Sequence, residues 1–513
     1  MVIVGAGPAG LTTAYQLLKK GSKYKVIVIE KEDCVGGISK TLSYKGNRMD
    51  LGGHRFFSKI KEINELWLEL LEEQGEVISK ELEPPQRNEY PGRANPNNSE
   101  NVMLIRRRVS RIYYLKKFFD YPIAVNCKTL MNMGVLRTII SGLGYVWSSI
   151  FKRREDSLED FYINRFGRPL YKMFFKDYTT KLWGISPEYL APDWGSQRVK
   201  QLSLFKTIKD AVLRKILPNY TTNESSLIEE FYYPKYGPGQ LWEKMASKIA
   251  EMGGEIHLNV ECCKIHVDKN QVTKVVVQDN KVGEKEIECN YIVSSMAIKD
   301  LFNCLDFQKP QEVVDVANAL PYRDFITIGV LVEELELKNK TNFETFNELI
   351  PDCWLYIQEK NIKMGRMQIF NNWSPYMVAE PQNMVWIGLE YFCSEGDELW
   401  TMTDKEFSTF AIDELIQMGI VRRDKVLDFV VHKVQKAYPA YYGSYKDMSL
   451  LREYIDGFQN LLCVGRNGQH RYNNMDHSMM TGILAADAIC GNVSKELIWN
   501  VNTESTYQEE ENE

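Results

Sequence analysis

The sequence predicts an α/β fold in which a Rossmann-type domain is joined to a second, α+β domain. Two observations predict it. The chain opens on an apolar strand that runs straight into a glycine turn and a helix, and short apolar strands return far downstream, near residues 291–297 and 461–465. A chain of 513 residues has room for about two to four domains. We therefore expect both domains to be discontinuous along the sequence.

Composition narrows the class of protein. Hydrophobic residues make up 44% and charged residues 26%, as in ordinary globular proteins. Lys and Arg number 63 against 69 Asp and Glu, a net charge of −6, which argues against nucleic acid as a partner. The ten cysteines include no C-x-x-C and the six histidines no H-E-x-x-H. This pattern predicts a reduced, cytoplasmic protein without a metal site.

The glycine turn is GAGPAG, between the strand Val2–Val4 and a helical pattern over Leu11–Lys20. Gly5 allows the tight turn, Gly7 lets the backbone approach a pyrophosphate, and Gly10 lets helix and strand pack closely. The N-terminus of the following helix presents free N–H groups and a positive dipole end to the phosphates.

A second strand, Lys25–Glu30, ends on an acid. Glu30 stands 20 residues after Gly10, where a carboxylate can accept hydrogen bonds from ribose hydroxyls. A glycine turn alone could be purely structural. With strand, helix, strand and acid in this order, the segment predicts a dinucleotide site.

A second glycine pair, Gly36-Gly37, and the stretch DLGGHRFFS over residues 50–58 indicate which dinucleotide is bound. Together with the first turn they resemble the flavoprotein superfamily of amine oxidases, phytoene desaturases, protoporphyrinogen oxidases and UDP-galactopyranose mutases. The resemblance implies a glutathione-reductase/amine-oxidase-like domain that binds FAD non-covalently. In such proteins Gly36 and Gly37 would run along FAD, with Gly53 and His54 near the flavin ring.

Two distant segments complete the cofactor domain. The stretch PKYGPGQL (residues 234–241) leads through a helix to a strand that ends at Val260, and Leu461–Gly465 is a strand followed by a loop and a helix over Asp476–Ile489. The resemblance implies that this last helix starts at the flavin, where its dipole would stabilise negative charge on the reduced ring. Asp476 is alternatively the N-cap of that helix. The cofactor contacts expected here come from Val260, Gly465, Arg466, Met475 and Asp476.

These segments set the expected domain limits. The FAD domain is expected to comprise residues 1–80, 231–300 and 452–500. The substrate domain would comprise residues 81–230 and 301–451. The polar, acidic residues 501–513 are expected to be a disordered tail.

The segment FFKDYTTKLWG (residues 174–184) resembles a motif of the mutases, and by that resemblance Trp183 lies near the sugar and the flavin. Arg198 and Arg366 stand where the mutases carry arginines that hold the nucleotide diphosphate. Two guanidinium groups suit a diphosphate because each donates charge-assisted hydrogen bonds in pairs. The competing interpretation of either arginine is an ordinary surface ion pair.

Further expected substrate contacts lie on both sides of this region. The segment GRNGQHRYNNMD (residues 465–476) resembles the mutase pattern G-R-x-G-x-x-x-Y-x-x-M-D. It implies that Tyr472, together with Tyr438, hydrogen-bonds the diphosphate, and Asn474 stands where bacterial mutases have aspartate. The basic and aromatic stretch over residues 106–122, which includes Tyr114, resembles a hairpin that covers the nucleotide base. A solvated amphipathic hairpin is the alternative.

The resemblance implies a flavin-dependent pyranose–furanose mutase acting on a nucleotide sugar for cell-surface polysaccharide synthesis, through a reduced-flavin–sugar adduct. Its catalytic residues would be Arg198, Arg366, Trp183 and His54, and NAD(P)H would reduce the flavin. Two alternatives remain open. One is an FAD-dependent oxidoreductase with net substrate oxidation, and the other is a non-catalytic flavin-binding partner in a polysaccharide assembly complex.

An apolar run over Met133–Phe151 is followed by the basic triplet Lys152–Arg154. Arg137, Ser141 and three glycines interrupt it, so we expect a buried or amphipathic helix in a large domain. Peripheral contact with a membrane is the alternative. The sequence does not predict the oligomeric state, because no heptad and no exposed apolar stripe stands out.

Overall fold

A computed structural model describes residues 1–84, 93–121, 123, 127–192, 195 and 230–502. Its first sheet is parallel, with strand order β10-β2-β1-β14-β20. The strands are β1 (Val2–Val4), β2 (Ile27–Glu30), β10 (Glu255–Leu258), β14 (Ile292–Ser294) and β20 (Leu461–Cys463). The α/β fold is therefore confirmed.

Alternate residues of these short strands enter two separate cores, as strand geometry requires. Ile3 and Val28 pack with α1 (Pro8–Lys19), α10 (Gly239–Glu251) and α18 (Met475–Ile489) on one face. Val2, Val4 and Ile29 pack on the other. That second face is covered by β11 (Val260–Asp268), β12 (Gln271–Asp279), β13 (Gly283–Glu288), α11 (Ile298–Cys304), α12 (Gln311–Asn318) and α16 (Met448–Asp456).

The second sheet has seven strands in the order β19-β15-β18-β17-β16-β7-β8. Neighbours are antiparallel except β16 and β7. The bounds are β7 (Ser110–Tyr114), β8 (Lys117–Asp120), β15 (Tyr322–Val332), β16 (Trp354–Ile357), β17 (Arg366–Ile369), β18 (Val385–Cys393) and β19 (Val426–Pro439). α15 (Asp404–Met418) packs on it, starting at a Thr403–Glu406 capping box and ending at Gly419, whose φ is +71°.

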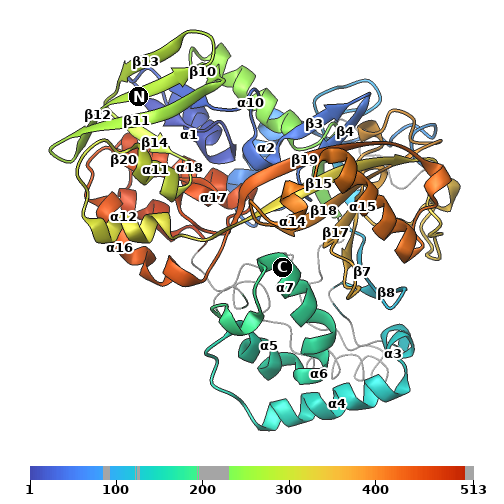
Figure 1. The fold of residues 1–513 in the computed structure, drawn as a ribbon. Helices are drawn as coiled ribbons and strands as arrows, with labels where there is room; N and C mark the ends of the chain where they lie inside the picture. Colours follow the sequence, from blue (N-terminus) through green and yellow to red (C-terminus); the bar gives the residue numbers. More distant parts are fainter. Residues whose placement is uncertain (85–92, 122, 124–126, 193–194, 196–229, 503–513) are drawn as a thin grey trace, which may run out of the picture.

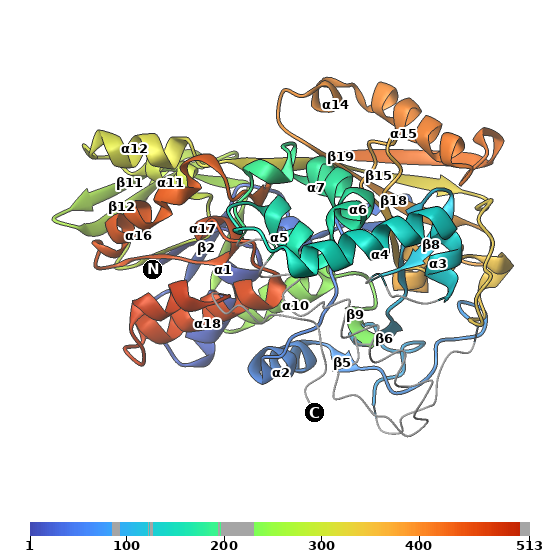
Figure 2. The same ribbon diagram turned by 90° about the horizontal axis from the view of Figure 1, so that it is seen from below.

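A helical part lies below the two sheets in Figure 1 and in front of them in Figure 2. It comprises α3 (Cys127–Met133), α4 (Val135–Ile150), α5 (Leu158–Phe166), α6 (Arg168–Tyr171), a π-turn η2 (Lys172–Lys176) and α7 (Asp177–Trp183). Ser157 caps α5 by accepting a hydrogen bond from the backbone N–H of Asp160. π-turns in helices are frequent at functional sites, and this one leads directly into α7.

Shorter elements connect these parts. The strands are β3 (Thr41–Tyr44), β4 (Asn47–Asp50), β5 (Glu72–Glu73), β6 (Val102–Arg107) and β9 (Glu230–Pro234). The helices are α2 (Lys61–Leu70), α13 (Phe370–Trp373), α14 (Glu398–Thr401) and α17 (Gly465–Gly468). The 3-10 turns are η1 (Gly37–Ser39), η3 (Pro187–Tyr189), η4 (Phe346–Glu348), η5 (Pro375–Met377), η6 (Arg423–Lys425), η7 (Gly443–Asp447) and η8 (Lys495–Asn500).

All five strands of the parallel sheet come from residues 1–80, 231–300 and 452–500. We propose these ranges as the FAD domain. Residues 81–230 and 301–451, which supply the seven-stranded sheet and the helical part, are the proposed substrate domain. The predicted tail over 501–513 lies almost entirely outside the described residues.

Two sequence expectations are wrong. α18 starts at Met475 and its N-cap is Asn474, so Asp476 lies inside the first turn. Asn and Asp are equally good caps, and residues further along the helix decide between them. The apolar run forms α4, whose large apolar side chains are exposed, so an exposed apolar stripe does exist. No helix among the described residues is long and apolar enough to cross a membrane.

Candidate functional site

A cavity of about 1730 Å³ lies where the carboxyl ends of the parallel strands face the second sheet. This edge is where open α/β sheets bind ligands. Pockets for one small ligand usually measure about 300–1,000 Å³. The cavity therefore has room for a dinucleotide together with a second molecule.

The glycine turn forms one end of the cavity, and its geometry explains the glycines. A Cβ on Gly10 would come within 2.0 Å of the carbonyl oxygen of Gly5. Gly5 itself has φ +102° and no room beside Ser295. A Cβ on Gly7, by contrast, would meet only Gly37, at 3.8 Å. Gly5 and Gly10 are thus required by packing, whereas Gly7 leaves open space at the N-terminus of α1 for a phosphate.

Glu30, at the end of β2, is buried and lines the cavity. Its Oε2 accepts a hydrogen bond from the N–H of Ala6 (2.8 Å) and its Oε1 one from the N–H of Glu32 (3.0 Å). The carboxylate therefore braces the glycine turn. Each oxygen keeps a further lone pair for a ribose hydroxyl.

The second glycine pair lies against the first turn. The N–H of Gly36 donates to the carbonyl of Ala6 (2.9 Å), and Gly36 and Gly37 have φ +105° and +54°. Gly37 lines the cavity. The two glycine turns thus form a single cradle of backbone, and Val260 lines the same end.

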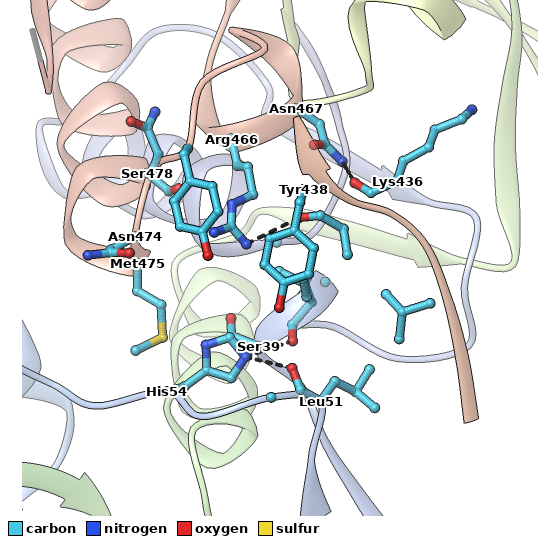
Figure 3. Close-up of a pocket in the computed structure, with 18 of the residues that line it drawn as sticks. Ser39, Leu51, His54, Lys436, Tyr438, Arg466, Asn467, Asn474, Met475 and Ser478 are labelled. Atoms are coloured by element: carbon cyan, nitrogen blue, oxygen red, sulfur yellow. Dashed lines mark hydrogen bonds between the residues drawn. The ribbon is translucent and has the colours of Figure 1, made fainter. Parts of the chain in front are cut away.

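His54 lies further into the cavity, after Gly53 (Figure 3). Its Nε2 lies 2.9 Å from the carbonyl of Leu51 and 3.1 Å from that of Ile38. Burial, together with the nearby Arg466 guanidinium, lowers the pKa of His54 to about 4. The ring is therefore neutral at pH 7, and its Nε2–H donates to these carbonyls.

The C-terminal segment supplies the facing wall. The Arg466 guanidinium lies 4.3 Å from the ring centre of Tyr472 and 5.4 Å from that of Tyr438, and the two rings stack at 5.6 Å. Its Nη1 donates to the carbonyl of Ala437 (3.3 Å). Figure 3 shows Arg466 and Tyr438 converging toward His54. Both tyrosines and the arginine line the cavity.

The N-terminus of α18 points into the cavity beside them. The Asn474 side chain accepts from the N–H of His477, and Nδ1 of His477 accepts from the N–H of Asn474 (3.3 Å). Ser58 donates to the Asp476 carboxylate (3.0 Å), which ties the segment after His54 to this helix. Asn474, Met475 and Asp476 all line the cavity.

Arg366 on β17 is the centre of a buried polar group on the second sheet. Its Nε donates to the Tyr178 hydroxyl (2.9 Å) and its Nη1 to the Glu390 carboxylate (3.2 Å). Gln368 donates to the other oxygen of Glu390 (3.0 Å). Burial raises the pKa of Glu390, and the Arg366 cation opposes that rise. Burial alone would lower the pKa of Arg366, but Tyr178 and Glu390 more than offset it and the pKa is raised.

Sequence reasoning missed Glu390, Gln368 and Tyr356, which line the cavity around Arg366. One signal could have found Glu390: it is the single charged residue in the fully buried strand VWIGLEYFC. A buried carboxylate without a functional or structural partner is rare. Arg55 and Arg108 also line the cavity, so the same region carries several cations.

Most predicted site residues in the described part of the chain line this one cavity. They are Gly5, Gly7, Glu30, Gly37, Gly53, His54, Val260, Arg366, Tyr438, Gly465, Arg466, Tyr472, Asn474, Met475 and Asp476. Trp183 is buried behind the lining, edge-on to Tyr472 at 6.5 Å. Tyr114 packs edge-on against Phe174 at 5.7 Å, also behind the lining. Arg198 lies outside the described residues.

Fold and cavity define a dinucleotide-binding α/β protein with a second, polar compartment beside the cofactor cradle. The family model of flavin containing amine oxidoreductases matches residues 8–490, and the chain belongs to this family. It is an FAD enzyme, and the open space at Gly7, the braced Glu30 and the helix start at Asn474 fit that cofactor. Within the described residues, no group of three His, Cys, Asp or Glu side chains could hold a metal ion.

Solved structures share the fold over almost the whole chain. A reduced UDP-galactopyranose mutase is 20% identical, with 99% of each chain covered and a TM-score of 0.76. A protoporphyrinogen oxidase-type protein from Exiguobacterium sp. 255-15 is 12% identical, with 95% of this chain and 98% of that chain covered and a TM-score of 0.63. Cyclohexylamine oxidase from Brevibacterium oxydans IH-35A is 12% identical, with 96% and 98% covered and a TM-score of 0.60.

Proposed function

We propose that this protein is a flavin-dependent pyranose–furanose mutase that acts on a nucleotide sugar. The observation that carries the proposal is the Arg366 group: a guanidinium held by Tyr178 and Glu390 at the wall of the cavity. Guanidinium groups donate pairs of charge-assisted hydrogen bonds to phosphate oxygens. Arg466 lines the same cavity, beside the stacked rings of Tyr438 and Tyr472.

The charge of this compartment argues against an amine as substrate. Four arginines line the cavity, Arg55, Arg108, Arg366 and Arg466, and the Glu390 carboxylate balances the charge of Arg366 alone. A protonated amine next to these cations would be repelled, whereas a diphosphate would be attracted. The hydroxyls of Tyr178, Tyr438 and Tyr472 add neutral donors for phosphate or sugar oxygens.

Each residue has a proposed role. Arg366 holds the diphosphate, with Arg198 as the second arginine from the predicted motif. Glu390 and Tyr178 fix the Arg366 fork, and neutral His54 holds the Gly52-Gly53 loop by donating to Leu51. Bound FAD, in its reduced form, supplies the nucleophilic ring nitrogen. Held in place, the leaving diphosphate stays ready to return, which is an orientation effect.

The proposed setting follows from the substrate. A nucleotide sugar for cell-surface polysaccharide synthesis is made in the cytoplasm, where NAD(P)H is available to reduce the flavin. We include both as parts of the proposal. The alternatives, an oxidoreductase with net substrate oxidation and a non-catalytic flavin protein, are outcomes of the experiment below.

The test is whether the purified yellow protein converts UDP-galactopyranose to the furanose isomer. Chromatography measures the two isomers. Activity is expected only after reduction of the flavin, without net oxidation. Arg366→Ala should lower kcat/KM by about tenfold to a hundredfold, since charge-assisted hydrogen bonds contribute about 1.5–3 kcal/mol. Arg423→Ala is the matched control, because Arg423 is exposed and is not among the residues that line the cavity.

Two results would overturn the proposal. Turnover in air with release of peroxide would identify an oxidase. A reduced, FAD-loaded protein that converts no nucleotide sugar and releases no peroxide would fit the non-catalytic alternative.

A further inference from the structure

The helix α4 presents its apolar side to solvent. Its eight large apolar side chains are each about half exposed or more. They recur at spacings of three and four residues, so they form one continuous stripe. The stripe consists of Val135, Leu136, Ile139, Ile140, Leu143, Val146, Trp147 and Ile150.

The inward side of α4 is made of small residues. Ser141 and Ser148 are buried, and a Cβ on Gly144 would come within 2.5 Å of Pro169 on α6. In Figure 1, α4 runs along the lower edge of the molecule with α5 and α6 above it, and in Figure 2, seen from below, it lies at the front. A helix of a globular protein normally turns its apolar side to the core. α4 instead turns its apolar side to solvent, which indicates that this side contacts an apolar partner.

The patch is local. Two thirds of the exposed large hydrophobic side chains of the described residues lie between Tyr121 and Phe151. Single exposed hydrophobic residues are normal on protein surfaces, but a contiguous apolar patch marks an interaction site.

The charges around the stripe indicate which kind of partner it binds. No acidic residue occurs between Asp120 and Glu155, although the whole chain has a net charge of −6. Arg137 on α4 is exposed, and Lys152, Arg153 and Arg154 follow the helix and are exposed as well. Arg153 pairs with Asp160 (3.2 Å) and Arg154 with Asp156 (2.8 Å). Such exposed pairs contribute little stability, so these arginines can turn to another anion.

We propose that α4 lies in the surface of an anionic lipid bilayer, with the stripe in the boundary between headgroups and acyl chains. An apolar helix face that carries Trp and Leu and is flanked by Lys and Arg is the pattern of interfacial helices. The ring centres of Trp147 and Phe151 lie 4.3 Å apart, next to these cations. Aromatic residues are enriched at the level of the lipid headgroups. A second copy of the same face fits less well, because it would bring the cations of both copies together.

The experiment measures co-sedimentation of the FAD-loaded full chain with vesicles of phosphatidylglycerol and phosphatidylcholine, and with vesicles of phosphatidylcholine alone. The variant combines Leu143→Ser and Trp147→Ser, whose side chains are 68% and 65% exposed, so the fold is not at risk. Val282→Ser is the matched control, since Val282 is 65% exposed in the turn between β12 and β13. Flavin absorbance and far-UV circular dichroism confirm that each variant is folded.

The wild-type protein and Val282→Ser should bind the anionic vesicles, and 0.5 M NaCl should weaken binding. The double variant should need at least about tenfold more lipid to reach the same bound fraction. The proposal is overturned if wild-type protein does not bind anionic vesicles, or if it binds neutral vesicles equally well. It is likewise overturned if the double variant binds as well as wild-type protein. It is also overturned if wild-type protein dimerises without lipid and the double variant is monomeric, because the face then belongs to a second copy. None of these outcomes depends on mutase activity.

Discussion

Arg366 and Glu390 form the buried ion pair on which the substrate end of the cavity depends. Glu390 is fully buried, and its two oxygens accept from Arg366 (3.2 Å) and Gln368 (3.0 Å). A buried ion pair adds little net stability, but removing one partner leaves an uncompensated charge. The two side chains should therefore behave as a unit.

We predict the outcome of a double-mutant cycle with Glu390→Gln and Arg366→Gln. Each single variant should lower the free energy of unfolding by about 2 kcal/mol, less than for a fully dry pair because Arg366 borders the cavity. The double variant should cost less than the sum, with a coupling of about 1–2 kcal/mol. Urea unfolding of the apoprotein measures all four free energies. Simple additivity would mean that the two charges do not stabilise each other.

The residues of this pair differ in how far the sequence reveals them. Arg366 could be predicted because a short motif resembles one in a known family. Glu390 could not, because its role depends on strand register. β17 and β18 place Arg366 directly opposite Glu390, and β16 places Tyr356 on the other side of Arg366. Register is set by the hydrophobic patterns of both paired strands and by the turns that join them, so the segment around Glu390 alone does not reveal its partner.

At the scale of elements, α18 depends on its first turn, which also borders the cofactor cradle. Asn474 caps the helix, and His477 closes the capping box from the third helical position. The sequence Asn473-Asn474-Met475-Asp476 offers three good capping residues in four positions, so the sequence alone could not choose among them. The imidazole at position 477 makes the choice, because its Nδ1 accepts from the N–H of Asn474.

We predict that Asn474→Ala lowers the free energy of unfolding by about 1 kcal/mol, the usual cost of a lost N-cap. Asn474→Asp should restore the stability, because aspartate caps as well and its charge favours a helix N-terminus. Urea unfolding of the apoprotein checks both values. An alanine variant as stable as the wild-type protein would show that Asn474 does not hold the helix start.

The strands and helices of the parallel sheet could be predicted to within about three residues, whereas the face of α4 could not. The glycine turns and apolar strands are local signals, and β1, β2, β14 and β20 lie where those signals indicate. For α4 the apolar pattern gives a stripe but not the side on which it lies. Gly144 packs against Pro169 of α6, and Ser141 and Ser148 are buried, so tertiary packing fixes that side.

At the scale of the whole molecule, the cavity joins segments that are far apart in the chain. Its lining includes Gly7 and Glu30 near the N-terminus, Val260 and Ser295 in the middle, and Gly465 and Met475 near the C-terminus. The Arg366 side of the cavity belongs to the second sheet. A molecule bound there contacts all three sequence segments of the proposed FAD domain and one wall of the proposed substrate domain.

FAD should therefore stabilise the protein as one unit. At FAD concentrations a hundred times Kd, binding adds about 2.7 kcal/mol to the native state, which for a unit of this size we expect to raise Tm by about 2–3 °C. Circular dichroism and tryptophan fluorescence should report the same shift. FMN is the matched control ligand: it lacks the adenylate half, so it cannot reach the end of the cavity formed by Glu30 and Val260, and it should give almost no shift at that concentration. Equal stabilisation by FMN and FAD would mean that the cradle holds a mononucleotide, and the assignment of Glu30 to a ribose would then be wrong.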